Sequence, residues 1–282
     1  MTLAIGLVLA ATVIGVLGPW YLAAMVRPAV RPGLALVAWA SSAVLFVGAM
    51  LVASLLLALP KGSGLDGFIG MAGSCVNIVR QDGDVVWAHV VRLGVAAVLF
   101  SLVMRVAVVA VGAVRRQRRW RRDHVSLLGA LARPDRGVFW LDAPLPVAYS
   151  VGGRRGWVVA TSAVDGLGPR RRAAILSHEE AHLRGRHHLL VLGAEVLASA
   201  LPFVPLCRRA PAAVRVLAEL AADVGAARRH GTGAVRSARP CGAGPGWSRV
   251  STVAVVLMSA VPAAFATASA AVLLLLWCLT RV

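Results

Sequence analysis

The sequence predicts a multi-pass α-helical membrane protein that also contains a small α+β domain. The first observation is composition, because 59% of the 282 residues are hydrophobic and only 15% are charged. Such values are typical of membrane proteins and not of soluble globular chains. The second observation is the stretch His178-Glu179-Glu180-Ala181-His182, which matches the pattern H-E-x-x-H and is typical of a metal-binding helix.

Four apolar segments are long enough to cross a bilayer. They comprise residues 3–26, 34–60, 93–113 and 250–280, and Arg105 is the only charged residue within them. We therefore divide the chain into three transmembrane helices in residues 1–113, a domain outside the hydrocarbon layer in residues 114–249, and a fourth transmembrane helix in residues 250–282. No further domain is expected after that helix.

Arginine residues decide the expected orientation. Six of them lie between Arg115 and Arg122, directly after the third apolar segment, and the positive-inside rule places such a run in the cytoplasm. Residues 114–249 are therefore expected inside the cell and both termini outside. The net charge of +18 is accounted for by this boundary and by contact with anionic lipid. No nucleic-acid-binding module accompanies the charge, so no direct nucleic-acid partner is expected.

Within the domain, short elements precede the metal motif. Residues 123–132 favour a short helix, and 133–137 favour a turn by composition. Three short β-prone runs separated by Pro- and Gly-containing turns follow, at residues 138–141, 147–151 and 156–161. We expect a small sheet laid against the helix that carries the metal motif. The four cysteines lack C-x-x-C spacing, so a zinc–thiolate site or a disulfide framework is not expected.

The metal motif itself favours a helix from about residue 169. Pro169 suits the first helical position, where its missing N–H costs nothing. His178 and His182 then fall at i and i+4, so both imidazoles leave one face at the spacing that a single zinc ion needs. Glu179 is placed to act as a general base on a water at the metal rather than as a ligand.

A second pair of residues lies downstream on an alanine- and leucine-rich helix. Glu219 and Asp223 are again at i and i+4. We expect Glu219 to be the third zinc ligand, with the fourth position open for water, and Asp223 to hold a ligand histidine through its second ring nitrogen. The predicted cofactor is one zinc ion per chain. An additional donor to the oxyanion is expected, and the sequence leaves five candidates open: Tyr149, His187, His188, Arg228 and His230. Of these, His187 and His188 are expected at the surface.

The apolar run at residues 189–206 lies between the two metal motifs. A single crossing would separate Glu219 from His178 and His182, and eighteen residues are too few for two crossings. Arginines at both ends place both ends inside. We therefore expect a buried or interface-lying helix that does not cross, and the sequence leaves open whether it dips into the bilayer. The Arg-, Gly- and Pro-rich residues 228–249 are expected to form a flexible linker.

These features resemble the BlaR/MecR family of bacterial membrane zinc metallopeptidases. The matching segments are residues 148–153 (AYSVGG), 158–161 (VVAT), 175–188 (ILSHEEAHLRGRHH) and 219–223 (ELAAD). The resemblance implies a cytoplasmic, zincin-like domain of the gluzincin type, zinc bound by His178, His182 and Glu219, and Glu179 as general base. It further implies a cytoplasmic protein substrate, a winged-helix repressor, whose cleavage transduces a signal and relieves repression. No C-terminal sensor domain of the family's kind is expected after the last apolar segment, so the resemblance does not by itself imply β-lactam sensing.

Two alternatives remain beside this interpretation. One is a quality-control zinc protease for membrane proteins, but such enzymes usually place two more transmembrane segments between the metal motifs. The other is a non-catalytic, zinc-binding signal transducer or scaffold. The presence of Glu179 argues against it, because a binding site alone does not need a base.

Overall fold

A computed structural model describes residues 2–25, 31–59, 83–153 and 156–233. The chain divides into two compact units. Of the described residues, the first unit contains 2–11, 47–59 and 83–105, and the second contains 12–25, 31–46, 106–153 and 156–233. The expected fourth transmembrane helix and the loop at residues 60–82 lie outside the described residues.

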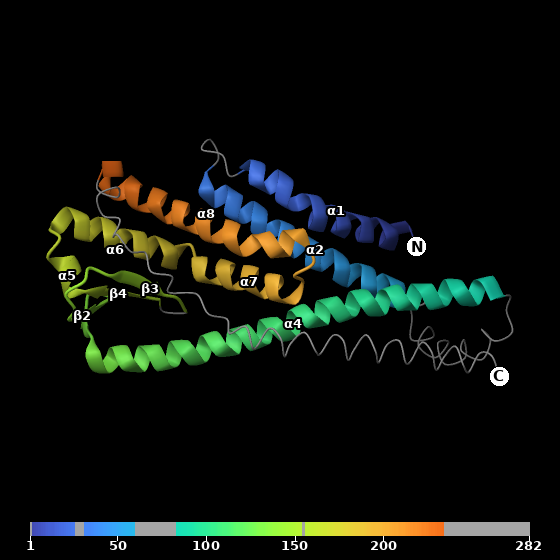
Figure 1. The fold of residues 1–282 in the computed structure, drawn as a ribbon, viewed down its shortest axis with the longest axis horizontal. Helices are drawn as coiled ribbons and strands as arrows, with labels where there is room; N and C mark the ends of the chain where they lie inside the picture. The colour runs from blue at the N-terminus through green and yellow to red at the C-terminus, as the bar shows by residue number, and fades with distance from the viewer. Residues whose placement is uncertain (1, 26–30, 60–82, 154–155, 234–282) are drawn as a thin grey trace. The chain divides into compact units, whose positions relative to one another are not determined.

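Three long apolar helices dominate the chain (Figure 1). They are α1 (Thr2–Met25), α2 (Pro32–Ala58) and α4 (Gly83–Leu131). Each contains a segment long and apolar enough to cross a membrane, which agrees with the first three predicted spans. In the first unit, Ala4, Leu57 and Ala96 form a small buried cluster, so all three helices contribute to the packing there. Orientation relative to the membrane stays a prediction.

The helix α4 is longer than the sequence suggested. We expected a span at residues 93–113, a charged boundary, and a separate short helix at 123–132, but one continuous helix covers all of them. The physical reason is local, since residues 113–128 contain neither proline nor glycine and arginine is a strong helix former. The basic run is therefore helical.

A four-stranded mixed sheet follows α4, in the order β1-β2-β4-β3. Its strands are β1 (Arg133–Asp135), β2 (Val138–Leu141), β3 (Ala148–Val151) and β4 (Trp157–Thr161). The last three agree with the predicted runs. The segment 133–137, expected to be a turn, instead supplies strand β1, and only Arg136 and Gly137 form the turn. Both have positive φ angles, 46° and 86°, as a tight antiparallel hairpin requires.

The two faces of the sheet pack on different helices. On one face, Leu128 of α4 lies against Val151 and Val159. On the other face, Ala160 packs with Val164 and Ile175, which belong to the short helix α5 (Ser162–Asp165) and to α6 (Pro169–Arg184). Figure 1 shows the sheet between α6 and the end of α4. Because side chains alternate along a strand, neighbouring residues of β3 serve opposite faces.

Two further helices complete the second unit. They are α7 (His187–Ala200) and α8 (Pro205–His230), which pack along one another. The 14 residues of α7 extend over about 21 Å, less than the roughly 30 Å of a hydrocarbon core, so α7 is too short to cross a bilayer by itself. The first residues of the predicted linker at 228–249 are helical, because α8 continues to His230; residues beyond 233 lie outside the described part of the chain.

Candidate metal centre

Three side chains from two helices point their ligand atoms at one position. The Nε2 atoms of His178 and His182, both on α6, lie 3.1 Å apart. Glu219 on α8 lies 3.4 Å from the first nitrogen through Oε2 and 3.6 Å from the second through Oε1. A tetrahedral zinc ion with bonds of 2.0–2.1 Å places neighbouring ligand atoms about 3.3 Å apart. The donor set and its spacing therefore fit zinc.

The site is open on one side. The side chains of His178 and His182 are 21% and 15% exposed, whereas that of Glu219 is 63% exposed. Three protein ligands with an accessible fourth position are the arrangement of catalytic zinc sites, while structural sites are closed by four protein ligands. Water and a substrate can therefore reach this position from the side of Glu219.

Close packing of α6 on α8 brings the two halves of the site together. A Cβ built on Gly225 of α8 would lie 3.1 Å from the Cβ of Ala181 of α6, so the two backbones approach as closely as small residues allow. Farther along, Arg229 of α8 forms an ion pair with Glu180 of α6 at 3.2 Å. The glycine contact lies two residues from Asp223 and holds the acidic face of α8 against the histidine face of α6.

Each histidine also has a partner behind it. Nδ1 of His178 lies 3.1 Å from Oδ1 of Asp223, the residue that we expected to contact the second ring nitrogen of a histidine. Nδ1 of His182 lies 3.0 Å from Nδ1 of His187. When Nε2 faces a cation, Nδ1 carries the ring proton and donates it to this outer partner, which fixes the tautomer and the ring orientation.

The position of His187 differs from our expectation of a surface residue, since it is only 7% exposed. The reason lies in the turn between α6 and α7. Arg186 has a left-handed conformation with φ 48°, which reverses the chain and returns His187 over His182. Gly185 leaves the necessary room, because a Cβ there would lie 2.2 Å from Nε2 of His187. Burial, and then the nearby His182, lower the pKa of His187 to about 4, so it is a neutral acceptor at physiological pH.

The electrostatics around the ligand atoms suit a cation. Hydrogen bonds from His178 and His182 hold the pKa of Glu219 well below its usual range, so its carboxylate is charged. Burial lowers the pKa of His178, but its hydrogen bond to Glu219 and the negative charges of Glu179, Glu219 and Asp223 outweigh that effect and raise it. A site whose carboxylates favour a positive charge on an imidazole also favours a metal ion in its place.

Glu179 lies beside the two histidine ligands, and Ser150 of the sheet acts on its carboxylate. Burial raises the pKa of Glu179 above its usual value; the positive charges of His178 and His182, and a hydrogen bond from Ser150 of β3, act in the opposite direction. A carboxylate with a raised pKa is a stronger base near neutral pH than an exposed one. Sequence reasoning missed Ser150 as a partner. The sequence did contain an indication, because Ser150 follows Tyr149 in the predicted strand and therefore lies on the opposite face of the sheet.

The structure reduces the five candidates for an oxyanion donor. Tyr149 belongs to the face of the sheet that packs on α4, and its hydroxyl bonds Nε2 of His124 at 2.9 Å. It therefore lies on the face opposite to Ser150. His187 is occupied by its contact with His182. His188, half-buried against Gly152, and Arg228 and His230, exposed at the end of α8, remain as candidates.

Comparison of the chain with protein-family models, curated proteins and solved structures finds no match. The function is therefore inferred from the geometry of the chain's own residues.

Proposed function

We propose that this chain is a membrane-anchored zinc metalloendopeptidase of the gluzincin type. The observation that carries the proposal is the convergence of His178, His182 and Glu219, whose ligand atoms all lie within 4.8 Å of one another. Glu179, adjacent in sequence to the first ligand, supplies the base that peptide hydrolysis requires. The membrane anchor follows from the three apolar helices.

The chain's residues would divide the reaction as follows. His178, His182 and Glu219 would hold a zinc ion, which would supply a Lewis acid for the scissile carbonyl and for water. Glu179 accepts the proton of the attacking water and returns it to the leaving amine. Ser150 would favour the charged form of Glu179, because it lowers the pKa of that carboxyl group. Asp223 and His187 hold the two imidazoles so that both Nε2 atoms face the same position.

We infer that the substrate is a cytoplasmic protein, and the resemblance to the BlaR/MecR family indicates a winged-helix repressor whose cleavage transduces a signal. The length of α7 supports this choice over a quality-control protease, because its 14 residues leave no room for two crossings between α6 and α8. The position of a half-buried Glu179 next to the ligand His178 supports an enzyme over a non-catalytic transducer, since only catalysis needs a base there.

The test compares wild type with Glu179→Gln in full-length protein reconstituted into liposomes. Zinc content is measured by mass spectrometry, and cleavage is measured on a peptide library and on any winged-helix repressor encoded beside this chain. Glu179→Gln should keep zinc, because all three ligands remain, and should lose about 10²–10⁴-fold in cleavage rate. Glu180→Gln is the matched control, since Glu180 pairs with Arg184 and Arg229 and should retain cleavage.

Two outcomes would contradict the proposal. Cleavage by Glu179→Gln at the wild-type rate would remove Glu179 from the chemistry. Relief of repression in cells by Glu179→Gln, with the repressor intact, would identify a non-catalytic transducer.

A further inference from the structure

The turn between α7 and α8 packs against α1 at three consecutive levels. A Cβ built on Gly15 would lie 3.2 Å from Cγ1 of Val204, and one on Gly18 would lie 3.1 Å from Cδ1 of Leu206. The guanidinium of Arg209 lies over the ring of Trp20, 5.7 Å from its centroid. All of these residues belong to the second unit.

These contacts set a register between the two helices. Between the first and the third contact, the residue number increases by five on α1, from Gly15 to Trp20. It also increases by five at the start of α8, from Val204 to Arg209, so α8 runs parallel to α1. Five residues correspond to about 7.5 Å along a helix. We call α7, α8 and the turn between them the α7–α8 hairpin, and its tip is residues 201–206. The tip therefore lies about 7.5 Å from the level of Trp20, toward the N-terminal end of α1. This part of α1 belongs to the segment Leu3–Ala23, which is long and apolar enough to cross a membrane.

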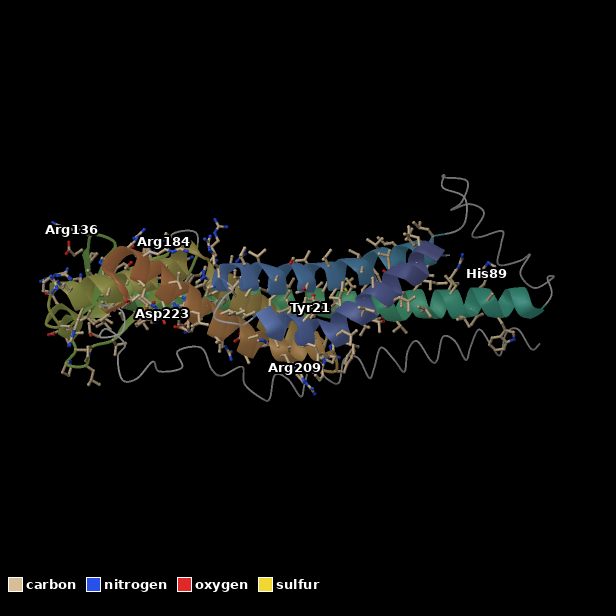
Figure 2. The ribbon with its side chains drawn as sticks, turned by 90° about the horizontal axis from the view of Figure 1, so that it is seen from above. Tyr21, His89, Arg136, Arg184, Arg209 and Asp223 are labelled. Carbon is tan, nitrogen blue, oxygen red and sulfur yellow. The ribbon has the colours of Figure 1, made fainter. Side chains whose placement is uncertain are left out.

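The level of Trp20 has the character of a membrane interface. Trp20 and Tyr21 are both exposed, and such aromatic residues are enriched where hydrocarbon meets head groups. Arg208 and Arg209 lie at the same level on α8, with long stems suited to reach head groups. In Figure 2 Tyr21 and Arg209 lie at one level along the unit, and Asp223 lies farther toward the sheet.

Beyond that level, the hairpin is free of charge. Residues 196–207 are uncharged and are bounded by Glu195 and Arg208, and Glu195 is neutralised by its ion pair with Arg215. Phe203 at the tip is 63% exposed, which is unfavourable in water. On α1 the outward residues of the same level, such as Val16 at 47% exposure, are also apolar. The tip therefore continues the apolar surface of α1.

We propose that the tip of the α7–α8 hairpin, residues 201–206, is inserted into the hydrocarbon layer beside α1 and returns without crossing. Its occupant is the acyl-chain region of the lipid, which surrounds Phe203. Leu201 and Leu206 are fully buried. Gly15 and Gly18 have no side chains, so the turn can approach α1 closely. An insertion of about 7.5 Å lies within the 5–10 Å by which interfacial helices enter a bilayer.

This placement also fixes the height of the metal centre. Glu219 follows Arg209 by ten residues on α8, which corresponds to about 15 Å along the helix. A peptidase acting here, as the proposed function has it, reaches only peptide bonds within about 15 Å of the hydrocarbon edge. The substrate class is then a membrane-associated protein or one brought to the inner surface.

The test measures the depth of single spin labels in full-length protein in liposomes, and its readout does not depend on peptidase activity. The four cysteines are replaced, and single cysteines are introduced by Phe203→Cys, by Val16→Cys as the matched position on α1, and by Arg184→Cys as the aqueous control. Collision with dissolved oxygen reports hydrocarbon, and collision with a water-soluble nickel chelate reports water. Retention of zinc shows that each variant is folded, and Pro202→Cys, also exposed at the tip, replaces Phe203→Cys if that variant loses zinc.

We expect the label at Phe203 to match that at Val16, with oxygen collisions favoured and nickel collisions suppressed, while the label at Arg184 shows the reverse. A label at Phe203 that collides with nickel as freely as the one at Arg184 would overturn the proposal. So would a water-accessible label at Val16, because the tip would then sit beside a part of α1 that lies outside the membrane.

Discussion

His182 and His187 face each other through their Nδ1 atoms, which lie 3.0 Å apart. The distance requires that one nitrogen donates and the other accepts, so the two rings have coupled tautomers. Because His187 is neutral, with a pKa of about 4, its Nδ1 can accept a hydrogen bond from the Nδ1–H group of His182, which leaves Nε2 of His182 free for the metal. His187 is therefore a positioning residue for the candidate centre.

Replacing this partner should weaken the metal site without removing a ligand. We expect His187→Ala to raise the dissociation constant for zinc by about 10–100-fold, as is typical when the partner of a ligand histidine is lost. The measurement is competition with a chromophoric chelator in detergent. His230→Ala is the control, since His230 is exposed at the end of α8 and should leave zinc affinity unchanged. Equal affinities in wild type and His187→Ala would show that His182 needs no such partner.

Gly185 offers a test of the same geometry from the backbone. A side chain at this position would meet the His187 ring at 2.2 Å, so Gly185→Ala must displace His187 and should weaken zinc binding in the same direction as His187→Ala. The matched control is Gly193→Ala in α7, where nothing lies within 4 Å of the added Cβ and alanine favours a helix. If both alanine variants bind zinc as wild type does, the space around Gly185 has no role in the site.

Glu219 and Asp223 should differ in the size of their effects, because one is a proposed ligand and the other supports one. Glu219→Ala removes a ligand and should lose most of the bound zinc on dialysis. Asp223→Ala should retain the three ligands and lose about 10–100-fold in affinity or activity. Zinc content per chain, measured by elemental analysis after dialysis, separates the two cases. Full occupancy and activity in Glu219→Ala would mean that the third ligand is another residue.

The parts of the site that the sequence could predict are those set by local spacing. His178 and His182 share a face because they are four residues apart on a helix that Pro169 starts, and Glu219 and Asp223 share a face for the same reason. The prediction that the two faces meet needed only that no crossing separates them. The length of α7 agrees with that condition.

The parts that could not be predicted depend on contacts distant in sequence or on an unusual backbone. His187 reaches His182 only because Arg186 adopts a left-handed conformation. The sequence gives no indication of this, because arginine rarely has a positive φ angle. Ser150 reaches Glu179 because the strand register places it, and not Tyr149, on the face toward α6. The continuity of α4 was missed for another reason, since a charged run was read as a boundary although nothing in it breaks a helix.

The final prediction concerns the pH dependence of the proposed activity. A base must be deprotonated to act, so cleavage should fall on the acid side as Glu179 takes up a proton. The hydrogen bond from Ser150 lowers the pKa of Glu179, and its removal in Ser150→Ala should raise that pKa. The acid limb of kcat/KM should therefore move to higher pH, by about one unit if the bond contributes about 1.4 kcal/mol.

Ser150→Thr provides the control for this shift, since it keeps a hydroxyl and should leave the acid limb near its wild-type position. A merely structural role for Ser150 would lower the rate at every pH without moving the limb, so the profile distinguishes the two explanations. A shift toward lower pH in Ser150→Ala would contradict the assignment of Ser150 as a donor to the Glu179 carboxylate. Such a shift would mean that Ser150 stabilises the protonated acid.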